Sequence, residues 1–569
     1  MPNHINDHNF KPMIFTCSNK PIVQQLLKKC LKYSVKHVVI SPGSRNAPLT
    51  ISFTNNSLFT CYSIPDERSA AFYALGMAKI LNEPVAIICT SGTAVLNYAP
   101  ALAEAYYQEI PLIAITADRP PEWIDQEDGQ TIRQPNIYNN FINYCASLPL
   151  GNNEEELSLA KKEIEKAFSK ALANKKGPVQ INTPFEEPLY ELEEINLQTE
   201  IARNNEFIDD DINFDELIQV WNSSEKILII AGTMQPDEKL NRIISNLIEN
   251  KNAVVIAPSY SNLQHEKIIG IPEIIFNTLS KNAKQKLKPD LLISIGGSIV
   301  SKATKLFLRE FKPDRHFDID FNEHRVDTYL SLTDKIISSY SKALNYVNLK
   351  GQVKSQEYLK SILNIQEEKL KKSSSLIQTF ENSDIKIYKD ILESVDRKID
   401  LHFSNSTPIR YSELFLKNNK INYFSNRGTS GIDGNTSIAG GAAIVSNNQT
   451  VLITGDISFG YDSNAFWNKH VPYNLKVVVI NNGGGNIFRI ISGPSNSNSL
   501  EFFETPSTKS TEHFCKTYSI DYIRINAEQN IEQKFKELLD SKSCTVLEIF
   551  TDGKASAESY KELFRKLRK

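Results

Sequence analysis

The chain has 569 residues, of which 41% are hydrophobic and 23% are charged, as is usual for a globular protein. This length predicts about three to four domains. The formal net charge of −3 excludes a global positive field, so we expect no nucleic acid and no membrane surface among the partners. Any acidic ligand must then be bound by locally placed Arg and Lys side chains.

The cysteine pattern and the lack of long apolar runs indicate a cytoplasmic protein. Seven cysteines are scattered without a CxxC pair, which is typical of reduced thiols. The N-terminal segment lacks the basic and apolar regions of a signal peptide. No run of about 18 apolar residues predicts a membrane span.

The first third of the chain alternates strands and helices. Residues 35–45 read as a strand that runs into a Pro-Gly turn, and residues 58–81 as a strand followed by an Ala-rich helix. Residues 84–120 continue with strand, glycine turn, helix and strand. This alternation predicts a parallel sheet with helices on both faces. The stretch GPVQINTPFEEPL closes the first domain near residue 190, and we expect the acidic segment from there to about residue 215 to be a linker.

The rest of the chain repeats this alternation twice. The short apolar runs KILIIAGT, NAVVIAP, PDLLISIGG and RHFDID predict a second α/β domain over residues 215–353. A charged helical stretch follows over residues 354–383. The runs LHFSNS, INYFSN, VLITGD, KVVVINN and CTVLEIF predict a third α/β domain over residues 384–569. The expected fold class is therefore α/β, with three doubly wound parallel-sheet domains.

Polar residues end two strands of the third domain. One strand ends at Asp456, and the next ends at Asn482 before a turn of glycines. Parallel strands bring their carboxyl ends to one edge of a sheet, where open α/β folds bind ligands. The Asp and Asn side chains and the Gly484 carbonyl form an oxygen set that suits Mg²⁺ or Mn²⁺, with cofactor phosphates as further ligands. Each half alone also fits a helix cap or a plain loop.

Two common phosphate-binding motifs are missing from this turn. No P-loop lysine follows the glycines, and Phe488 stands where a dinucleotide fingerprint has another glycine. The turn therefore matches neither a P-loop nor a dinucleotide fingerprint.

Five motifs follow one another along the chain: SPGSRNAPL at 41–49, DERSAAFYALGMAK at 66–79, TADRPPE at 116–122, GQTIRQ at 129–134 and SNRGTSGIDG at 425–434. Together they resemble the MenD family of thiamine diphosphate (ThDP) enzymes, the 2-succinyl-5-enolpyruvyl-6-hydroxy-3-cyclohexene-1-carboxylate synthases of menaquinone biosynthesis. The resemblance implies a pyrimidine-binding domain at 1–190, a central domain at 215–353 and a diphosphate-binding domain at 384–569. Two positions depart from the family pattern: Ile457 replaces a glycine of the metal signature, and Gly129 stands where the family often has Asn.

The resemblance also implies a reaction. Members of this family decarboxylate 2-oxoglutarate and add the remaining carbanion to isochorismate, and ThDP supplies the carbanion chemistry. Glu67 is expected to protonate N1′ of the cofactor's aminopyrimidine in the partner subunit, which makes a homodimer the minimal unit and a homotetramer the larger alternative.

Site residues follow from the family motifs. Because both substrates are dicarboxylates, fixed donors must hold their carboxylates where water is excluded. The expected catalytic residues are Glu67, Gln130, Arg410 and Arg427; the substrate-binding residues are Ser44, Arg45, Arg119 and Lys302 on the isochorismate side and Ser406 on the 2-oxoglutarate side; the cofactor-binding residues are Glu67, Ile432, Gly455, Asp456, Asn482, Ile487 and Phe488; and the metal ligands are Asp456, Asn482 and Gly484.

Two other functions remain open from the sequence. One is a different ThDP carboligase or decarboxylase of the acetohydroxyacid synthase type, whose middle domain binds a flavin. The other is a non-catalytic subunit with a ThDP-enzyme fold. The presence of Glu67, Asp456, Asn482 and the arginines together favours an active enzyme.

Overall fold

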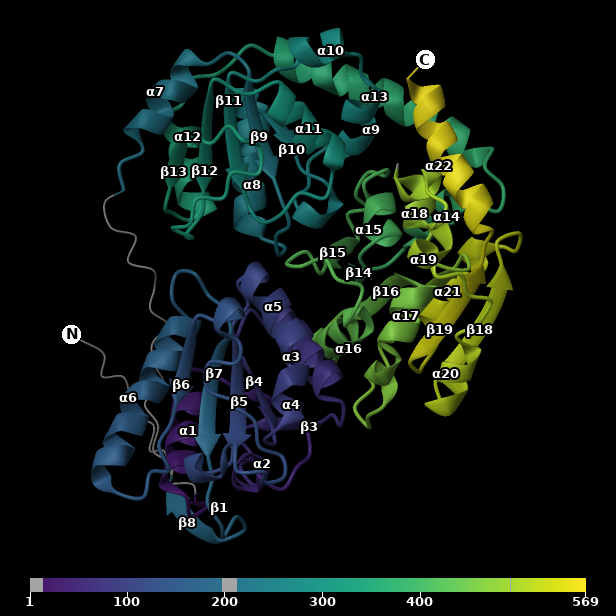
Figure 1. Ribbon diagram of the computed structural model, residues 1–569. Coiled ribbons are helices and arrows are strands. Elements are labelled where there is room, and N and C mark those ends of the chain that lie inside the picture. The colour runs from purple at the N-terminus through teal and green to yellow at the C-terminus, as the bar shows by residue number, and fades with distance from the viewer. Residues whose placement is uncertain (1–13, 197–211, 492, 569) are drawn as a thin grey trace, which may run out of the picture. The chain divides into compact units, whose positions relative to one another are not determined.

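The computed structural model describes residues 14–196, 212–491 and 493–568 (Figure 1). The chain forms two compact units. The first contains the described residues up to 196 together with Trp467–His470, and the second contains the other described residues.

The first unit is built on a parallel sheet of six strands in the order β3-β2-β4-β5-β7-β6. The inner strands β4 and β5 are buried along their whole length, because helices cover both faces of the sheet (Figure 1). The strands are β2 (His37–Ile40), β3 (Thr60–Ser63), β4 (Val85–Cys89), β5 (Leu112–Asp118), β6 (Tyr144–Ser147) and β7 (Val179–Pro184). The helices are α1 (Pro21–Lys32), α2 (Ala47–Thr54), α3 (Glu67–Leu81), α4 (Thr93–Asn97), α5 (Ala99–Gln108) and α6 (Glu154–Ala171).

An antiparallel ribbon of two strands completes the first unit. Strand β1 (Ile14–Ser18) pairs with β8 (Leu192–Asn196), with Cys17 opposite Glu193. The predicted linker is therefore wrong for Leu192–Asn196, because these residues form a strand that pairs with the start of the described chain. The rest of the predicted linker up to residue 211 lies outside the described residues.

The second unit begins with a parallel sheet of five strands in the order β10-β9-β11-β12-β13. The strands are β9 (Ile227–Ala231), β10 (Val254–Ile256), β11 (Leu291–Ile295), β12 (Arg315–Ile319) and β13 (Asp334–Ile336). The helices are α7 (Asp215–Ser223), α8 (Glu238–Lys251), α9 (Pro272–Thr278), α10 (Lys281–Lys286), α11 (Lys302–Glu310), α12 (Tyr340–Lys350) and α13 (Glu357–Gln378). The long helix α13 confirms the helical stretch predicted there.

The last sheet repeats the strand order of the first. Its six parallel strands lie in the order β15-β14-β16-β17-β19-β18, so both sheets place their strands in the chain order 2-1-3-4-6-5. The predicted fold class of three doubly wound parallel sheets is thereby confirmed. The strands are β14 (Ile399–Phe403), β15 (Ile421–Ser425), β16 (Gln449–Gly455), β17 (Leu475–Asn481), β18 (Asp521–Asn526) and β19 (Thr545–Phe550). The helices are α14 (Asp384–Ser394), α15 (Thr407–Ser412), α16 (Asn435–Val445), α17 (Asp456–Tyr461), α18 (Ile487–Ile490), α19 (Leu500–Glu504), α20 (Glu512–Thr517), α21 (Ile531–Asp540) and α22 (Gly553–Leu567).

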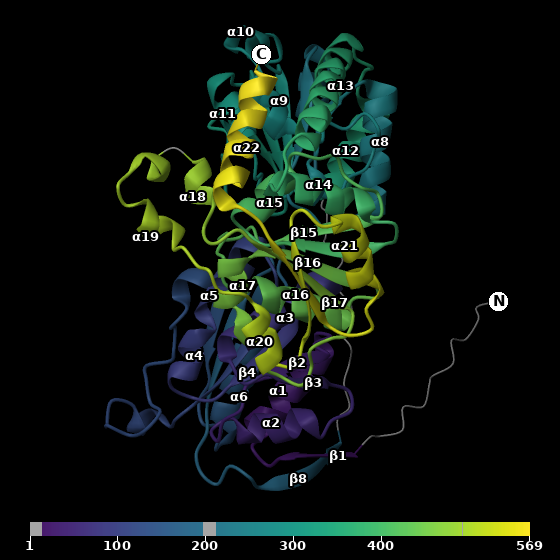
Figure 2. The same cartoon turned by 90° about the vertical axis from the view of Figure 1, so that its right-hand side faces the viewer.

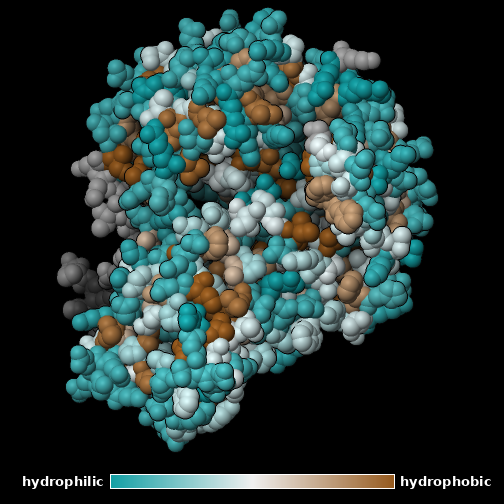
Figure 3. All heavy atoms as spheres, viewed as in Figure 1, coloured by the Kyte–Doolittle hydropathy of each residue, from teal (hydrophilic) through white to brown (hydrophobic). Residues whose placement is uncertain are grey.

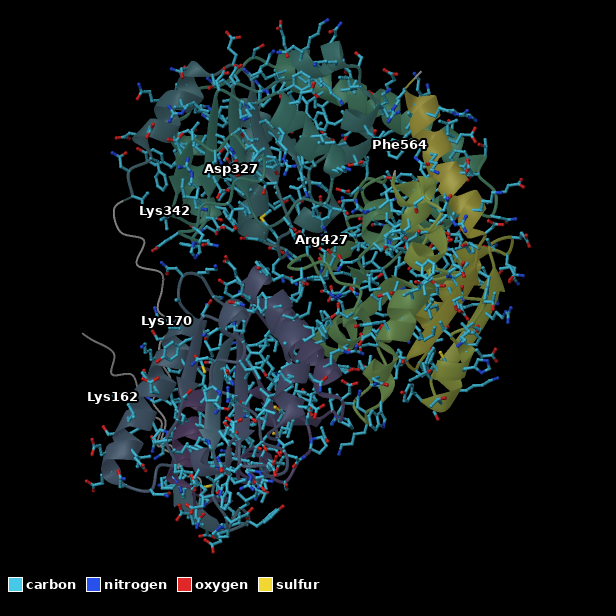
Figure 4. The ribbon with its side chains drawn as sticks, in the orientation of Figure 1. Lys162, Lys170, Asp327, Lys342, Arg427 and Phe564 are labelled. Carbon is cyan, nitrogen blue, oxygen red and sulfur yellow. The ribbon has the colours of Figure 1, made fainter. Side chains whose placement is uncertain are left out.

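The two sheets of the second unit share one hydrophobic core. The C-terminal helix α22 packs against α13 and α9, and Figure 2 shows it beside these helices. Its Phe564 belongs to the shared core (Figure 4). The face in Figure 3 is mainly hydrophilic, with apolar atoms in scattered groups. No helix among the described residues is both long and apolar enough to cross a membrane.

Candidate active site

Asp456 lies at the carboxyl edge of the last sheet. Strand β16 ends at Gly455, and Asp456 is the first residue of α17. The neighbouring strand β17 pairs with β16 in parallel and ends at Asn481, so both strand ends meet at one edge. The Asp456 Oδ2 atom is buried and accepts no hydrogen bond from any described residue. Burial raises the pKa of Asp456 to about 7, so the ionised carboxylate needs a positive partner.

Two buried acids hold the two asparagines at the end of β17, of which Asn481 is the last strand residue and Asn482 follows it. The Asn482 amide donates through Nδ2 to Asp384 Oδ2 over 2.8 Å. The Asn481 amide donates to Glu548 Oε1 over 2.7 Å and to the Lys509 carbonyl over 3.0 Å. Because Asn482 uses its amide nitrogen for Asp384, its Oδ1 atom is the one left for a cation.

The glycine turn is shaped by a segment that packs against it. Gly484 has a φ of 145°, and a Cβ there would lie 2.8 Å from the Glu504 carbonyl oxygen, so only glycine fits. The Gly485 N–H donates to that carbonyl over 2.6 Å, and the Arg489 guanidinium pairs with the Glu504 carboxylate, Nη2 to Oε2, over 2.6 Å. These contacts fix the direction of the backbone at the predicted metal ligand Gly484.

Apolar residues predicted to contact the cofactor surround the same edge. The Ser458 hydroxyl in α17 donates to the Ile432 carbonyl over 2.7 Å, which holds the loop of Ile432 beside the helix that begins at Asp456. Ile487 and Phe488 begin α18 directly after the glycine turn, and the Phe488 ring lies 5.6 Å from that of Phe503. The structure thus brings the predicted cofactor-binding residues of this unit to one sheet edge.

The predicted 2-oxoglutarate residues follow the two adjacent strands, β14 and β15. Ser406 precedes α15 with a φ of 76°, a strained conformation that is common at functional sites. Arg410 lies in α15, and Arg427 donates from Nη1 to Asn405 Oδ1 over 2.9 Å (Figure 4). The buried Glu413 has its pKa raised to about 8, chiefly by burial, while Arg410 and Arg427 lower it.

The central sheet contributes two lysines from α11. Lys302 is the exposed first residue of this helix, and the loop before it contacts Arg427, because Ser298 Oγ donates to the Arg427 carbonyl over 3.3 Å. Lys305, which was not predicted as a site residue, lies one turn further along. Burial lowers its pKa most, and the charge of Arg427 lowers it further. The spacing of three residues from Lys302 was a signal that could have identified Lys305.

Glu67 occupies the start of α3 in the first unit. The preceding Asp66 caps the helix by accepting a hydrogen bond from the Ser69 N–H over 3.0 Å. Glu67 is partly buried, and burial is the main cause that raises its pKa. A carboxyl with a raised pKa is suited to share a proton with a ring nitrogen.

Arg45 and Arg119 lie after strands β2 and β5 of the first unit. Arg45 is buried and donates from Nη1 to the Phe185 carbonyl over 2.9 Å, while Arg119 donates from Nη2 to the Gly129 carbonyl over 3.0 Å. The pKa of Arg45 is lowered by burial and then by the positive charge of Arg119. Each arginine already has an anionic partner, Arg45 with Glu187 over 3.3 Å and Arg119 with Asp128 over 3.4 Å. A substrate carboxylate that binds here would have to compete with these two side chains.

The remaining predicted residues of this unit lie in exposed loops. Ser44 is exposed between β2 and α2, and Gln130 is exposed with a φ of 58°. A Cβ at Gly129 would meet no atom within 4 Å, so the asparagine that the family often has would fit there. Steric crowding is therefore not the reason for the glycine.

Comparisons with known proteins match a segment in each of the two units. Residues 22–137 match the N-terminal, and residues 409–549 the C-terminal, TPP-binding domain of thiamine pyrophosphate enzymes. A 2-succinyl-5-enolpyruvyl-6-hydroxy-3-cyclohexene-1-carboxylate synthase of Flavobacterium psychrophilum is 42% identical over 94% of this chain and 97% of its own length. Synthases with the same name from Flavobacterium johnsoniae and Christiangramia forsetii are 39% and 37% identical, each over 96% of this chain and 99% of its own length.

The chain belongs to the 2-succinyl-5-enolpyruvyl-6-hydroxy-3-cyclohexene-1-carboxylate synthase family. It is a ThDP-dependent enzyme, and the residues of this synthase fit the cofactor. The buried Asp456 Oδ2 has no hydrogen-bond partner among the described residues, and the glycine turn has no side chains to block a diphosphate. No group of three or more His, Cys, Asp or Glu among the described residues could hold a metal ion. A cation in this synthase would thus be bound by one carboxylate with amide, carbonyl and phosphate oxygens.

Proposed function

We propose that this synthase decarboxylates 2-oxoglutarate and adds the resulting succinyl semialdehyde carbanion to isochorismate by 1,4-addition, with ThDP and Mg²⁺, or Mn²⁺, as cofactors. The observation that carries the proposal is a cation cluster, Arg410, Arg427 and Lys305, beside the sheet edge that would bind the cofactor. The charges of Arg410 and Arg427 both lower the pKa of the buried Glu413, and the charge of Arg427 also lowers the pKa of Lys305. Such a cluster suits the distal carboxylate of a dicarboxylic 2-oxo acid, which pyruvate lacks.

On the cofactor side, Asp456, Asn482 and the Gly484 carbonyl would bind the cation, and Gly455 would let the diphosphate approach. Ile432, Ile487 and Phe488 would contact the rings of the cofactor. When bound, ThDP supplies an electron sink for the carbanion. Glu67 would hold the proton at N1′ of the aminopyrimidine, and its raised pKa supports this role.

On the acceptor side, isochorismate carries two carboxylates that need fixed donors. We assign them to Arg45, Arg119, Ser44 and Lys302, and we place Gln130 near the reacting atoms. The buried Arg45 interacts electrostatically with Arg119, and the carboxylates of Glu187 and Asp128 already reach these two arginines over 3.3 and 3.4 Å, which supports binding of anionic groups here. On the donor side, Ser406 would assist Arg410 and Arg427.

The domain division and the assembly belong to the same proposal. We propose a pyrimidine-binding domain at 1–190, extended by strand β8, a central domain at 215–353 and a diphosphate-binding domain at 384–569. The active site would form between the first domain of one subunit and the last domain of its partner, in a cytoplasmic homodimer or homotetramer. The identical strand order of the first and last sheets supports such a paired arrangement.

The test is an assay of the purified protein with ThDP, Mg²⁺, 2-oxoglutarate and isochorismate, in which the product is identified by mass. We expect the mass of the adduct formed with loss of CO₂. Preference for pyruvate as the donor, together with a bound flavin, would instead support the acetohydroxyacid synthase type. A protein that binds ThDP but turns over neither donor would support the non-catalytic subunit.

A further inference from the structure

Asp384 is a buried acid that belongs to none of the motifs above. It is 1% exposed and is the first residue of α14, which packs beside α22 (Figure 2). Its Oδ1 atom accepts hydrogen bonds from Thr551 Oγ1 over 2.7 Å and from Ser556 Oγ over 3.0 Å. Its Oδ2 atom accepts one from Asn482 Nδ2 over 2.8 Å. The carboxylate is therefore held by three side chains and contacts the predicted metal ligand.

A buried carboxylate at this position is unfavourable unless its contacts offset the cost of removing its charge from water. The side chain is almost completely buried, so the cost of desolvating its charge must be offset by the hydrogen bonds from Thr551, Asn482 and Ser556. Two of these donors fix the position of the carboxylate: Thr551 directly follows β19, and Ser556 lies in α22. The third donor, Asn482, is the partner whose orientation matters for the cation.

An asparagine amide has two orientations of nearly the same shape, related by a half-turn. In one orientation Oδ1 points to a given site, and in the other Nδ2 does. Only the oxygen can bind a cation. Asp384 Oδ2 accepts a hydrogen bond from Asn482 Nδ2 but would repel Asn482 Oδ1, so it permits only the orientation in which Oδ1 is left for the metal.

We propose that Asp384 is a positioning residue that fixes the Asn482 amide with its oxygen toward the metal ion and thereby sets the affinity of the enzyme for that ion. The inference deepens the proposed function, since it rests on Asn482 as a metal ligand. Groups that orient metal ligands in this way typically change metal affinity by about 10- to 100-fold when they are removed.

The first experiment compares three substitutions by direct Mn²⁺ binding. Free Mn²⁺ is measured by electron paramagnetic resonance with the full-length enzyme and saturating ThDP. Asp384→Leu keeps the branched shape but removes the acceptor, and we expect Mn²⁺ to bind about 10- to 100-fold more weakly. Asp384→Asn keeps one oxygen for Asn482 while its amide group faces the two hydroxyls, so it should retain most of the affinity. Thr551→Val is the matched control, because it removes the hydrogen bond that Thr551 donates to Asp384 Oδ1 and leaves the contact between Asp384 and Asn482 in place.

These variants also separate positioning from folding. The melting temperature is measured without cofactor, and we expect Asp384→Leu and Thr551→Val both to lower it while only Asp384→Leu weakens Mn²⁺ binding. Equal Mn²⁺ affinity in Asp384→Leu and wild type would overturn the proposal. It would also be overturned if the loss in Thr551→Val were as large. A wild type without a ThDP-dependent Mn²⁺ site would overturn the proposed metal site and, with it, the role of Asp384.

A second experiment reverses the polarity of the pair and does not depend on the folding of Asp384→Leu. Asn482→Asp alone places two carboxylates in contact and should lose Mn²⁺ binding. In the double variant with Asp384→Asn, the amide at position 384 donates to the carboxylate at position 482, and the other oxygen of that carboxylate is left for the metal. We expect this variant to bind Mn²⁺ at least about tenfold more tightly than Asn482→Asp alone. A double variant that binds Mn²⁺ no better than Asn482→Asp would refute the coupling.

Discussion

Replacing Arg410 by alanine is the sharpest test of the proposed binding site for 2-oxoglutarate. Arg410 lies in α15, beside the loop whose Asn405 accepts a hydrogen bond from Arg427. Its charge and that of Arg427 both lower the pKa of the buried Glu413. Pyruvate lacks the distal carboxylate that these cations would bind. We therefore expect Arg410→Ala to impair the reaction of 2-oxoglutarate far more than that of pyruvate.

The size of the effect follows from how buried the pair would be. Leaving a fully buried charge without its partner costs about 3 to 5 kcal/mol. Arg410 is only partly buried, so solvent screening reduces the expected loss to roughly 2 to 3 kcal/mol. This corresponds to a decrease of about 30- to 150-fold in kcat/KM for 2-oxoglutarate.

The assay measures decarboxylation of each donor separately, in wild type, Arg410→Ala and Arg397→Ala. Arg397 is an exposed arginine of the same sheet region that pairs with Asp396 and Asp540, so its removal controls for loss of positive charge. We expect Arg397→Ala to behave as wild type. Equal losses on both donors in Arg410→Ala, or a wild type that uses pyruvate as well as 2-oxoglutarate, would refute the dicarboxylate pocket.

Three further predictions concern single residues. ThDP and Mg²⁺ at about 100 times the dissociation constant should stabilise wild type by ~2.7 kcal/mol, and thermal melts of Asp456→Ala should show no such gain; an undiminished shift would contradict the metal site. Glu67→Gln should bind ThDP but slow exchange of its C2 proton by about 10²- to 10⁴-fold, and exchange at the wild-type rate would reduce Glu67 to a helix-end charge. In the folded protein, Glu413 has a pKa of about 8, above its value of about 4.5 in the unfolded chain. Because the folded state then binds more protons between these two values, the wild type loses stability as the pH rises from about 4.5 to about 8. Glu413→Gln should therefore gain up to ~1.4 kcal/mol per pH unit relative to wild type in urea unfolding across that window, whereas a constant difference would mean that Glu413 is ionised in the fold.

The strands with continuous apolar runs were predictable from the sequence, and so were the edge strands β3, β10 and β15, but the edge strands β6 and β18 were not. The runs VAIIC and KVVVIN lie in the middle of sheets that are covered on both faces, so their residues are nearly all apolar. Strands β6 and β18 lie at sheet edges and mix polar with apolar residues, which hides their period. The acidic strand β8 is recognisable only from its pairing with β1, far away in the chain.

The candidate site divides in the same way. Asp456 and Asn482 could be placed together from the sequence because each follows a buried parallel strand, and adjacent strand ends meet at one edge. Asp384 could not be placed there, because it lies 98 residues from Asn482 and its contact depends on how α14 packs. The family resemblance predicted Arg410 and Arg427 as residues for 2-oxoglutarate, whereas Lys305 comes near Arg427 only through the packing of the central sheet region.

The most direct test of the central claim is the mass of the product formed from 2-oxoglutarate labelled with ¹³C at the four carbons that remain after decarboxylation. The purified enzyme is incubated with ThDP, Mg²⁺ and isochorismate, and matched reactions omit one component each. We predict a single adduct that carries all four labelled carbons, and only in the complete reaction. An adduct that forms without isochorismate, or equally well from pyruvate, would contradict the account.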